Sequence, residues 1–267
     1  MEAAFFDLDK TVIAKASIVA FGRPFYKEGL ISKTTVLRAL YTQLIFMQLG
    51  ASEQKIARIR ESVLALTKGW EQSKVKQIVK ETLTEIVEPI IFEEALELLE
   101  QHRQAGRKIY IVSASPQELV NPLGEYLKVD GSIASRAKID DKGHYLGSME
   151  FYAYGPYKAQ AMREIAEREN IDLSASYAYS DSYTDLPLLE AVGHPVVVNP
   201  DRVLLRLAKE KNWEIRNFVK PVRLSQRSKP VHKNPLAILI LALAGLGTAI
   251  LIASKPARKM LTKKRRY

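Results

Sequence analysis

The stretch "FFDLDKTVI", residues 5–13, places two acidic residues at the end of an apolar run. Residues 3–6 have the continuous apolar composition of a strand that is buried on both faces, which is typical of a parallel sheet. Asp7 and Asp9 follow directly, before the chain turns apolar again. Taken alone, two such acids also suit a simple turn. Ligands of open parallel sheets bind beyond the carboxyl ends of the strands, so the same two acids mark a candidate site.

After this strand, short apolar runs alternate with amphipathic patterns. Strands are expected at 108–112, 177–179 and 195–198, and helices at 116–127, 157–169, 186–192 and 202–211. This order predicts parallel βαβ units, hence an α/β fold with a Rossmann-like, three-layer parallel-sheet core. Two helix starts carry N-cap signals with proline at the first helical position: Ser115–Pro116–Gln117–Glu118, which reads as a capping box, and Asn199–Pro200.

Residues 14–90 interrupt the alternation. Segments 32–50, 52–70 and 73–89 read as three helices with no strand between them, which favours a helical cap inserted after the first strand. The catalytic core is therefore expected at 1–13 and 91–216. Residues 132–149 combine alternation with a glycine-containing turn, which indicates a short β excursion.

The formal net charge of +10 is confined to the end of the chain. From residue 217 onward there are 12 Lys and Arg and no acidic residue, whereas residues 1–216 hold 28 basic and 30 acidic residues. A nearly neutral body argues against a basic face for nucleic acid, so no nucleic-acid partner is expected. The absence of cysteine excludes disulfides and thiolate metal sites.

The basic segment surrounds an apolar one. Residues 235–253 contain no charged residue and are long enough, at about 1.5 Å per residue, to cross a hydrocarbon core of roughly 30 Å. They predict a transmembrane helix between a basic linker (217–234) and a basic tail (254–267); a buried core helix is the alternative.

Gly245, Ala249 and Ala253 form a row of small residues that suits helix–helix association. Basic flanks on both sides leave orientation open by the positive-inside rule. We expect a single-pass anchor in the cell membrane with a cytoplasmic catalytic domain.

Polar residues follow the other expected strands as well. They are Ser113 and Ser115 after 108–112, Asp181 and Asp185 after 177–179, and Lys158 at the start of a helix. Four carboxylates that share one crevice need a counter-ion. The four histidines, at 102, 144, 194 and 232, show no ligand spacing, so a cation with oxygen ligands, Mg²⁺, is expected. A lysine and two hydroxyls beside it suggest a phosphoryl group as substrate.

"DLDKT", "VSAS", Lys158 within "GPYKAQAM" and "SDSYTD" occur in the order of the four motifs of the haloacid dehalogenase-like superfamily. The chain resembles this family over residues 1–216. The helical insertion resembles subfamily IB, which includes the phosphoserine phosphatases.

The resemblance implies a role for each site residue. It makes Asp7 the nucleophile that forms an aspartyl-phosphate, and Asp9 the general acid and base. Both residues would also bind the metal ion, Asp7 through its carboxylate and Asp9 through its backbone carbonyl. Asp181 would be the second side-chain ligand of Mg²⁺, with Asp185 in support. Ser113 would bind phosphate oxygens and Lys158 would offset the charge of the transferred group. Ser115 and Thr11 are further phosphate-binding candidates, although Ser115 also suits a helix N-cap and Thr11 a loop brace.

The substrate is less defined. Phosphoserine phosphatases are expected to carry an acidic residue nine positions after the nucleophile, to bind the substrate ammonium, and here that position is Ala16. Ala16 and the predicted membrane helix together favour a membrane-proximal or lipid-linked phosphomonoester as the substrate. A soluble-metabolite phosphatase, phosphoserine included, is the first alternative. A non-catalytic, membrane-tethered regulatory protein is the second.

Overall fold

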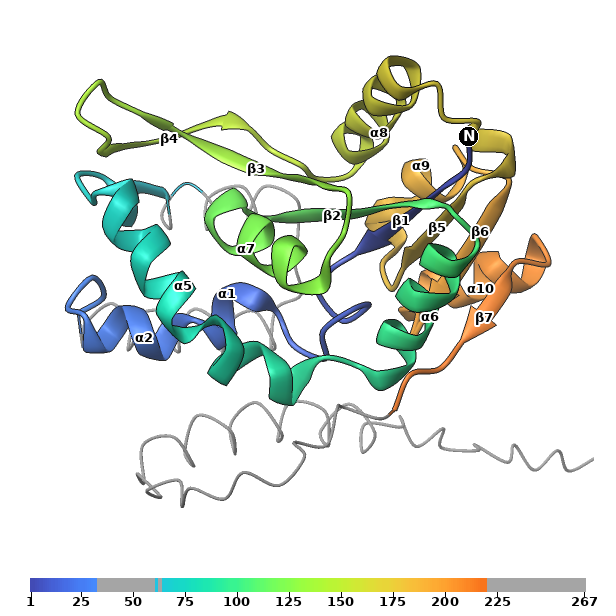
Figure 1. The fold of residues 1–267 in the computed structure, drawn as a ribbon, viewed down its shortest axis with the longest axis horizontal. Helices are drawn as coiled ribbons and strands as arrows, with labels where there is room; N and C mark the ends of the chain where they lie inside the picture. The colour runs from blue at the N-terminus through green and yellow to red at the C-terminus, as the bar shows by residue number, and fades with distance from the viewer. Residues whose placement is uncertain (33–60, 62–63, 220–267) are drawn as a thin grey trace, which may run out of the picture. The chain divides into compact units, whose positions relative to one another are not determined.

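The computed structural model describes residues 1–32, 61 and 64–219, and a seven-stranded sheet lies at the centre of these residues (Figure 1). The strands lie side by side in the order β4-β3-β2-β1-β5-β6-β7. All neighbouring pairs are parallel except β3 and β4. The strands are β1 (Ala3–Asp7), β2 (Lys108–Pro116), β3 (Gly131–Ile139), β4 (Tyr145–Phe151), β5 (Tyr177–Ser180), β6 (His194–Val198) and β7 (Glu214–Arg216).

Helices cover both faces of this sheet, so the expected α/β fold with a mostly parallel, three-layer core is confirmed. Apolar residues of α5, α6 and α7 pack on one face and those of α8, α9 and α10 on the other. In Figure 1, α6 and α7 lie below the strands and α8 above them. The helices are α1 (Ser17–Ala20), α2 (Gly22–Lys27), α5 (Gln72–Val87), α6 (Glu93–Gln104), α7 (Gln117–Leu127), α8 (Pro156–Glu169), α9 (Leu186–Leu189) and α10 (Arg202–Glu210), with 3₁₀ turns η1 (Glu88–Ile90), η2 (Leu173–Ala175) and η3 (Tyr183–Asp185).

The first strand is apolar throughout because it is buried on both faces. Phe5 belongs to one hydrophobic cluster and stacks on Tyr110 of β2, with ring centroids 5.1 Å apart. Phe6 belongs to the other cluster and stacks on Tyr179 of β5, at 4.3 Å. The strand therefore joins both core layers, and its last residue, Asp7, emerges at the carboxyl edge of the sheet.

The β structure is more extensive than the sequence pattern predicts. The β excursion expected at 132–149 is confirmed as the antiparallel pair β3 and β4, and β3 also pairs in parallel with β2, which brings β4 into the central sheet. The pattern shows alternation but does not show which strand is the partner. The edge strand β7, three residues long, was not expected, because so short a run carries no recognisable period.

Both predicted N-caps are wrong. Ser115 lies inside β2, and the residue that caps α7 is Pro116, which provides no side-chain hydrogen bond. Asn199 is likewise not a cap, because Asp201 caps α10 and its carboxylate accepts hydrogen bonds from the Val203 and Leu204 N–H groups. In each case the first helical turn begins later than the proline signal suggests.

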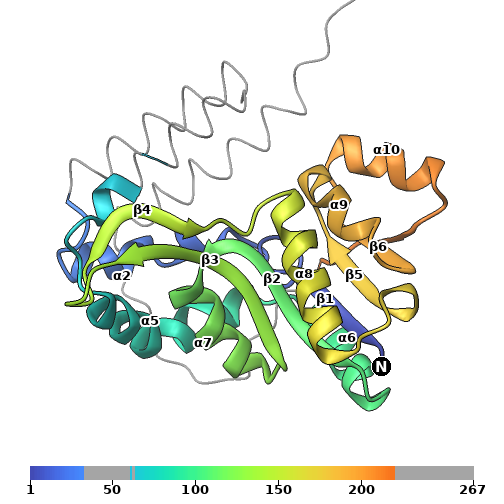
Figure 2. The same ribbon diagram turned by 90° about the horizontal axis from the view of Figure 1, so that it is seen from above.

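The insertion between β1 and β2 is only partly described. The expected helix at 73–89 is confirmed as α5, and α1 and α2 were not expected. The helix expected at 32–50 lies outside the described residues apart from residue 32. Of the helix expected at 52–70, only residues 61 and 64–70 are described. The Gly69 N–H donates to the Tyr145 carbonyl, and the Tyr145 N–H donates to the Trp70 carbonyl. These bonds attach the insertion to β4, alongside which α5 begins (Figure 2). Its assignment as a cap at 14–90 stays a prediction.

Most of the basic linker, the expected transmembrane helix at 235–253 and the basic tail lie outside the described residues. Of the helices within 1–32, 61 and 64–219, none is long and apolar enough to cross a membrane.

A close backbone contact at Gly193 provides a test of the packing between η2 and the residue that precedes β6. A Cβ atom at this position would lie 1.7 Å from the Ser174 carbonyl oxygen, so the backbone of one segment must move to accept a side chain. We expect Gly193→Ala to lower the free energy of unfolding by about 2 kcal/mol in urea denaturation. At Gly22 no atom lies within 4 Å of an added Cβ. Gly22→Ala is therefore the matched control and should change stability by about 0.5 kcal/mol or less. Equal effects at the two positions would contradict the packing described here.

Candidate active site

The chain turns sharply as soon as β1 ends. The Val12 and Ile13 N–H groups both donate to the Leu8 carbonyl, at 2.9 and 3.0 Å. Lys10 adopts a left-handed conformation, with φ of 65°. Side chains two apart on a straight strand point the same way but lie nearly 7 Å along it. The turn instead carries Asp9 away from β1 and places its carboxylate against Ser115 of β2.

Lys158, near the start of α8, connects the ends of two strands. Its Nζ atom lies 2.6 Å from Oδ1 of Asp7 and 2.7 Å from Oδ2 of Asp185. All three side chains are at least nine-tenths buried. The Ser180 hydroxyl, at the end of β5, donates a third hydrogen bond, of 2.7 Å, to the same Asp185 oxygen. One buried ammonium therefore holds together β1, α8 and the loop after β5.

Burial dominates the electrostatics of these groups. Desolvation raises the pKa of Asp7 above its ordinary range, and the charge of Lys158 opposes that rise. Burial alone would lower the pKa of Lys158, but the two neighbouring carboxylates raise it above its usual value. Desolvation also raises the pKa of Asp181, to about 6, against the opposing charge of Lys10 at 3.8 Å. Two buried carboxylates are thus incompletely compensated by the cations around them.

The carboxylate of Asp9 has hydrogen-bond donors on both oxygens. The backbone N–H of Ser17 donates to Oδ1 at 2.8 Å, and the Ser115 hydroxyl donates to Oδ2 at 3.0 Å. The hydroxyls of Ser17 and Ser115 are 2.7 Å apart. Asp7 pairs with the ammonium of Lys158, whereas Asp9 accepts hydrogen bonds from Ser17 and Ser115, so the two acids of "DLD" have different surroundings.

The remaining hydroxyl candidates are buried near the ends of β1 and β2. Ser113 accepts a hydrogen bond from the Ser115 N–H at 3.1 Å, which leaves its own hydrogen available to a ligand. Thr11 is buried, and within the described residues its Oγ1 atom has no hydrogen-bond partner. An unsatisfied buried hydroxyl is costly unless a ligand or solvent completes it.

Asp201, which the sequence interpretation did not assign to the site, anchors the loop that carries Asp181 and Asp185. Its Oδ2 accepts the Tyr183 N–H at 2.7 Å, and its own N–H donates to the Asp181 carbonyl at 2.8 Å. Ser17 and Ser180 were also missed. The signal for Asp201 was its position just before an amphipathic helix, where aspartate is a favoured N-cap.

The structure therefore brings Asp7, Lys158 and Asp185 into direct contact and joins Asp9 to Ser115. Asp181 lies in the same loop as Asp185 and contacts Lys10. Ser113 bonds to the backbone of Ser115. For Ser113 and Thr11 no contact with the carboxylates is recorded in the described part of the chain.

The oxygen donors suit a hard divalent cation. Within the described residues, no three or more acidic or histidine side chains are grouped to hold a metal ion by themselves. Mg²⁺ does not require such a group, because it binds through one or two carboxylates and completes its shell with waters and substrate oxygens. Asp7 and Asp181 are buried carboxylates short of positive charge, and this is the donor chemistry that the ion needs.

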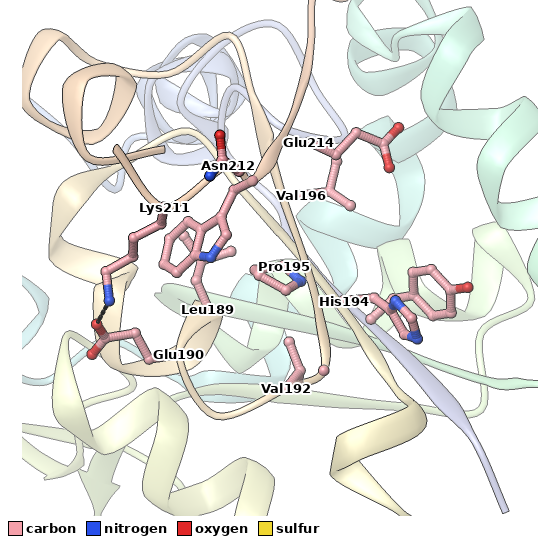
Figure 3. Close-up of a pocket in the computed structure, with 12 residues that line it drawn as sticks. Leu189, Glu190, Val192, His194, Pro195, Val196, Lys211, Asn212 and Glu214 are labelled. Atoms are coloured by element: carbon pink, nitrogen blue, oxygen red, sulfur yellow. Dashed lines mark hydrogen bonds and ion pairs between the residues drawn. The ribbon is translucent and has the colours of Figure 1, made fainter. Parts of the chain in front are cut away.

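A separate cavity of about 730 Å³ lies at the opposite edge of the sheet. Its lining includes Tyr177, His194 and Glu214, the first residues of β5, β6 and β7. In Figure 3 the ion pair between Lys211 and Glu190 forms one side of it. None of the carboxylates discussed above lines this cavity, so it is distinct from the candidate active site.

A sheet whose first strand ends in an acid, beside a buried lysine from a later helix, defines a class of α/β hydrolases. Residues 4–190 match the haloacid dehalogenase-like hydrolase family. The chain belongs to this family, and it is an enzyme of the hydrolase class.

Curated relatives agree with this assignment. The chain is 49% identical to an "inhibition of morphological differentiation protein" of Streptomyces azureus, over 92% of this chain and 89% of that protein. It is 44% identical to a probable phosphatase of Mycobacterium tuberculosis, over 94% and 86% of the two chains. A phosphoserine phosphatase of the same organism is 35% identical, over 81% of this chain and 70% of that one.

Solved structures share the fold. A protein of unknown function from Bordetella pertussis superposes with a TM-score of 0.70 at 23% identity, covering 80% of this chain and 97% of that chain. A phosphoserine phosphatase, solved as a phospho-aspartyl intermediate analogue, superposes with a TM-score of 0.55 at 20% identity, covering 81% and 92%.

Removal of Lys158 should leave two buried carboxylates unpaired. We expect Lys158→Met to lower the free energy of unfolding by about 3 to 5 kcal/mol at pH 7 without divalent cations, measured by urea denaturation. Lys10 is the matched control, because its side chain is 68% exposed and its pairing distance is 3.8 Å. Lys10→Met should cost about 0.5 kcal/mol or less. A Lys158→Met variant as stable as the Lys10→Met variant would show that the buried ion pairs are absent in solution.

Proposed function

We propose that this protein is a Mg²⁺-dependent phosphomonoester phosphatase that acts through an aspartyl-phosphate on Asp7. The observation that carries the proposal is the Lys158 ammonium, buried against Oδ1 of Asp7 at 2.6 Å. This contact fixes one oxygen of the nucleophile and leaves Oδ2 for phosphorus. The same ammonium brings positive charge to the place where phosphoryl transfer concentrates negative charge.

Two steps account for turnover. In the first, Asp7 Oδ2 attacks phosphorus, the bond from phosphorus to the ester oxygen breaks, and that oxygen takes a proton from Asp9. In the second, Asp9 takes a proton from water while the water oxygen attacks phosphorus. The bond to Asp7 then breaks, inorganic phosphate leaves, and both acids return to their starting states.

Asp7, Asp181 and the backbone carbonyl of Asp9 would hold the Mg²⁺ ion, with Asp185 in support. When bound, the ion supplies positive charge to the phosphate oxygens and to the buried carboxylates. The chain's own residues perform the transfers. The hydroxyls of Ser113 and Thr11 would donate to the phosphoryl oxygens. The Oγ1 atom of Thr11, which has no hydrogen-bond partner among the residues that the structure describes, supports this role.

The substrate we propose is membrane-proximal or lipid-linked. Ala16 occupies the position at which an acidic residue would bind the ammonium of phosphoserine. We further propose that residues 235–253 anchor the chain in the cell membrane with the catalytic domain on the cytoplasmic side. A soluble phosphomonoester is the second candidate, favoured by the 35% identity to the mycobacterial phosphoserine phosphatase. A non-catalytic regulatory role is disfavoured because every proposed catalytic position carries a competent side chain.

Catalysis by Asp7 is tested with p-nitrophenyl phosphate and the full chain. Asp7→Asn should lower kcat at least about a thousandfold, because the amide is a poor nucleophile. Asp141→Asn, in the exposed turn before β4, is the matched control and should retain full activity. Chelation with EDTA should abolish phosphate release by the unmutated protein, and excess Mg²⁺ should restore it. Turnover that survives either Asp7→Asn or EDTA would refute the proposed mechanism.

The substrate class is tested by comparing phosphoserine with lysophosphatidic acid in vesicles. We expect the lipid phosphate to have the higher kcat/KM. Ala16→Glu should raise kcat/KM for phosphoserine about tenfold by supplying a partner for its ammonium group, and should leave hydrolysis of p-nitrophenyl phosphate nearly unchanged. Activity confined to phosphoserine in the unmutated protein would exclude the lipid hypothesis.

A further inference from the structure

The two hydroxyls beside Asp9 form a directed chain. A hydroxyl has one hydrogen to donate, and that of Ser115 is donated to Oδ2 of Asp9. In the 2.7 Å contact between the two hydroxyls, the donor is therefore Ser17. The Ser17 hydroxyl therefore donates to the Ser115 hydroxyl, which donates to the Asp9 carboxylate. Both serines are buried, with exposed fractions of 2% and 6%, so bulk water competes little with this chain.

The chain ties together three segments that are distant in sequence. Asp9 lies in the turn after β1, Ser115 near the end of β2, and Ser17 at the start of α1 in the insertion. Ser17 contributes twice, since its backbone N–H also donates to Oδ1 of Asp9 at 2.8 Å. The Asp9 carboxylate is thus oriented through both oxygens, by groups that leave Asp7 and Lys158 untouched.

The two oxygens of Asp9 differ in what their donors permit. Oδ1 faces a backbone N–H, which only donates. Oδ2 faces a hydroxyl, which can rotate and accept instead of donate. The hydroxyl of Ser115 can therefore keep a hydrogen bond to Asp9 whether it donates or accepts, and the side chain stays oriented.

We propose that Ser17 and Ser115 are positioning residues that hold the carboxyl group of Asp9 in the orientation that proton transfer requires. The inference rests on the proposed function, because it assigns the serines to the acid–base half of that reaction. It also gives Ser115 a task other than phosphate binding or helix capping. The serines act on the leaving group only through Asp9.

Dependence on the leaving group separates this role from a structural one. An alkyl alkoxide is a poor leaving group and needs a proton from Asp9, whereas p-nitrophenolate leaves with little assistance. The measurement is the ratio of kcat/KM for glycerol phosphate to kcat/KM for p-nitrophenyl phosphate, because kcat/KM reports transfer to Asp7 and excludes the second step, which is the same for both esters. Both values come from one preparation of the full chain with Mg²⁺, so the ratio is independent of the fraction of folded enzyme.

Ser115→Ala should lower this ratio about tenfold, because a misplaced proton donor slows the first step mainly for the ester with the poor leaving group. Ser17→Ala should lower it about threefold, since its backbone N–H remains. The double variant should resemble Ser115→Ala, as both residues act along one chain. Ser115→Thr retains the hydroxyl and should restore most of the ratio. The matched control is Ser176→Ala, a buried serine at the amino edge of the sheet, which should leave the ratio unchanged.

A ratio unchanged in both Ser115→Ala and Ser17→Ala, in a protein that hydrolyses both esters, would overturn the positioning role alone. An equal fall in the ratio for Ser176→Ala would overturn it too. Failure of the unmutated protein to hydrolyse either ester would instead refute the proposed function on which it rests. If Ser115→Ala does not yield folded protein, Ser17→Ala provides the comparison, and an unchanged ratio in that variant would overturn the positioning role.

Discussion

The arrangement of the site depends on one buried cation between two buried carboxylates. Lys158 contacts Asp7 and Asp185, and each of these residues belongs to a different element of the sheet edge. Two carboxylates at this depth are unfavourable unless a positive charge accompanies them. The fold meets this requirement by placing the start of α8 against the carboxyl ends of β1 and β5. The position of Asp7, the direction of α8 and the conformation of the loop after β5 are therefore coupled.

This constraint also explains why Asp7 and Asp9, which are two positions apart, have different surroundings. Asp7 remains at the end of a straight, buried strand and is paired with an ammonium. Asp9 lies beyond a turn and accepts hydrogen bonds from Ser17 and Ser115. A carboxylate that attacks phosphorus needs a fixed oxygen and a free one. A carboxylate that moves protons needs partners that can exchange roles, and a hydroxyl is such a partner.

Much of the fold and site could be predicted from sequence because the informative residues directly follow apolar strands. β1, β5, β6 and most of the core helices were predicted to within a few residues, and four motifs in order placed Asp7, Lys158 and Asp185 at one edge. Partners distant in sequence could not be predicted: Ser115 meets Asp9 across 106 positions. For the same reason the sequence did not predict the pairing of β3 with β2, or the hydrogen bonds between Asp201 and the loop at 181–185. Local patterns report periodicity and turns, but they carry no information on which distant group completes a hydrogen bond.

The central claim is that the phosphoryl group passes through Asp7 and no other acid. Borohydride added during steady-state hydrolysis of p-nitrophenyl phosphate reduces an acyl phosphate to the alcohol, which converts the modified aspartate to homoserine. Mass spectrometry of the digested protein then locates the change. We expect homoserine at residue 7 only, and none when substrate is omitted. Homoserine at Asp9, Asp181 or Asp185, or unmodified residue 7 during active turnover, would contradict the claim.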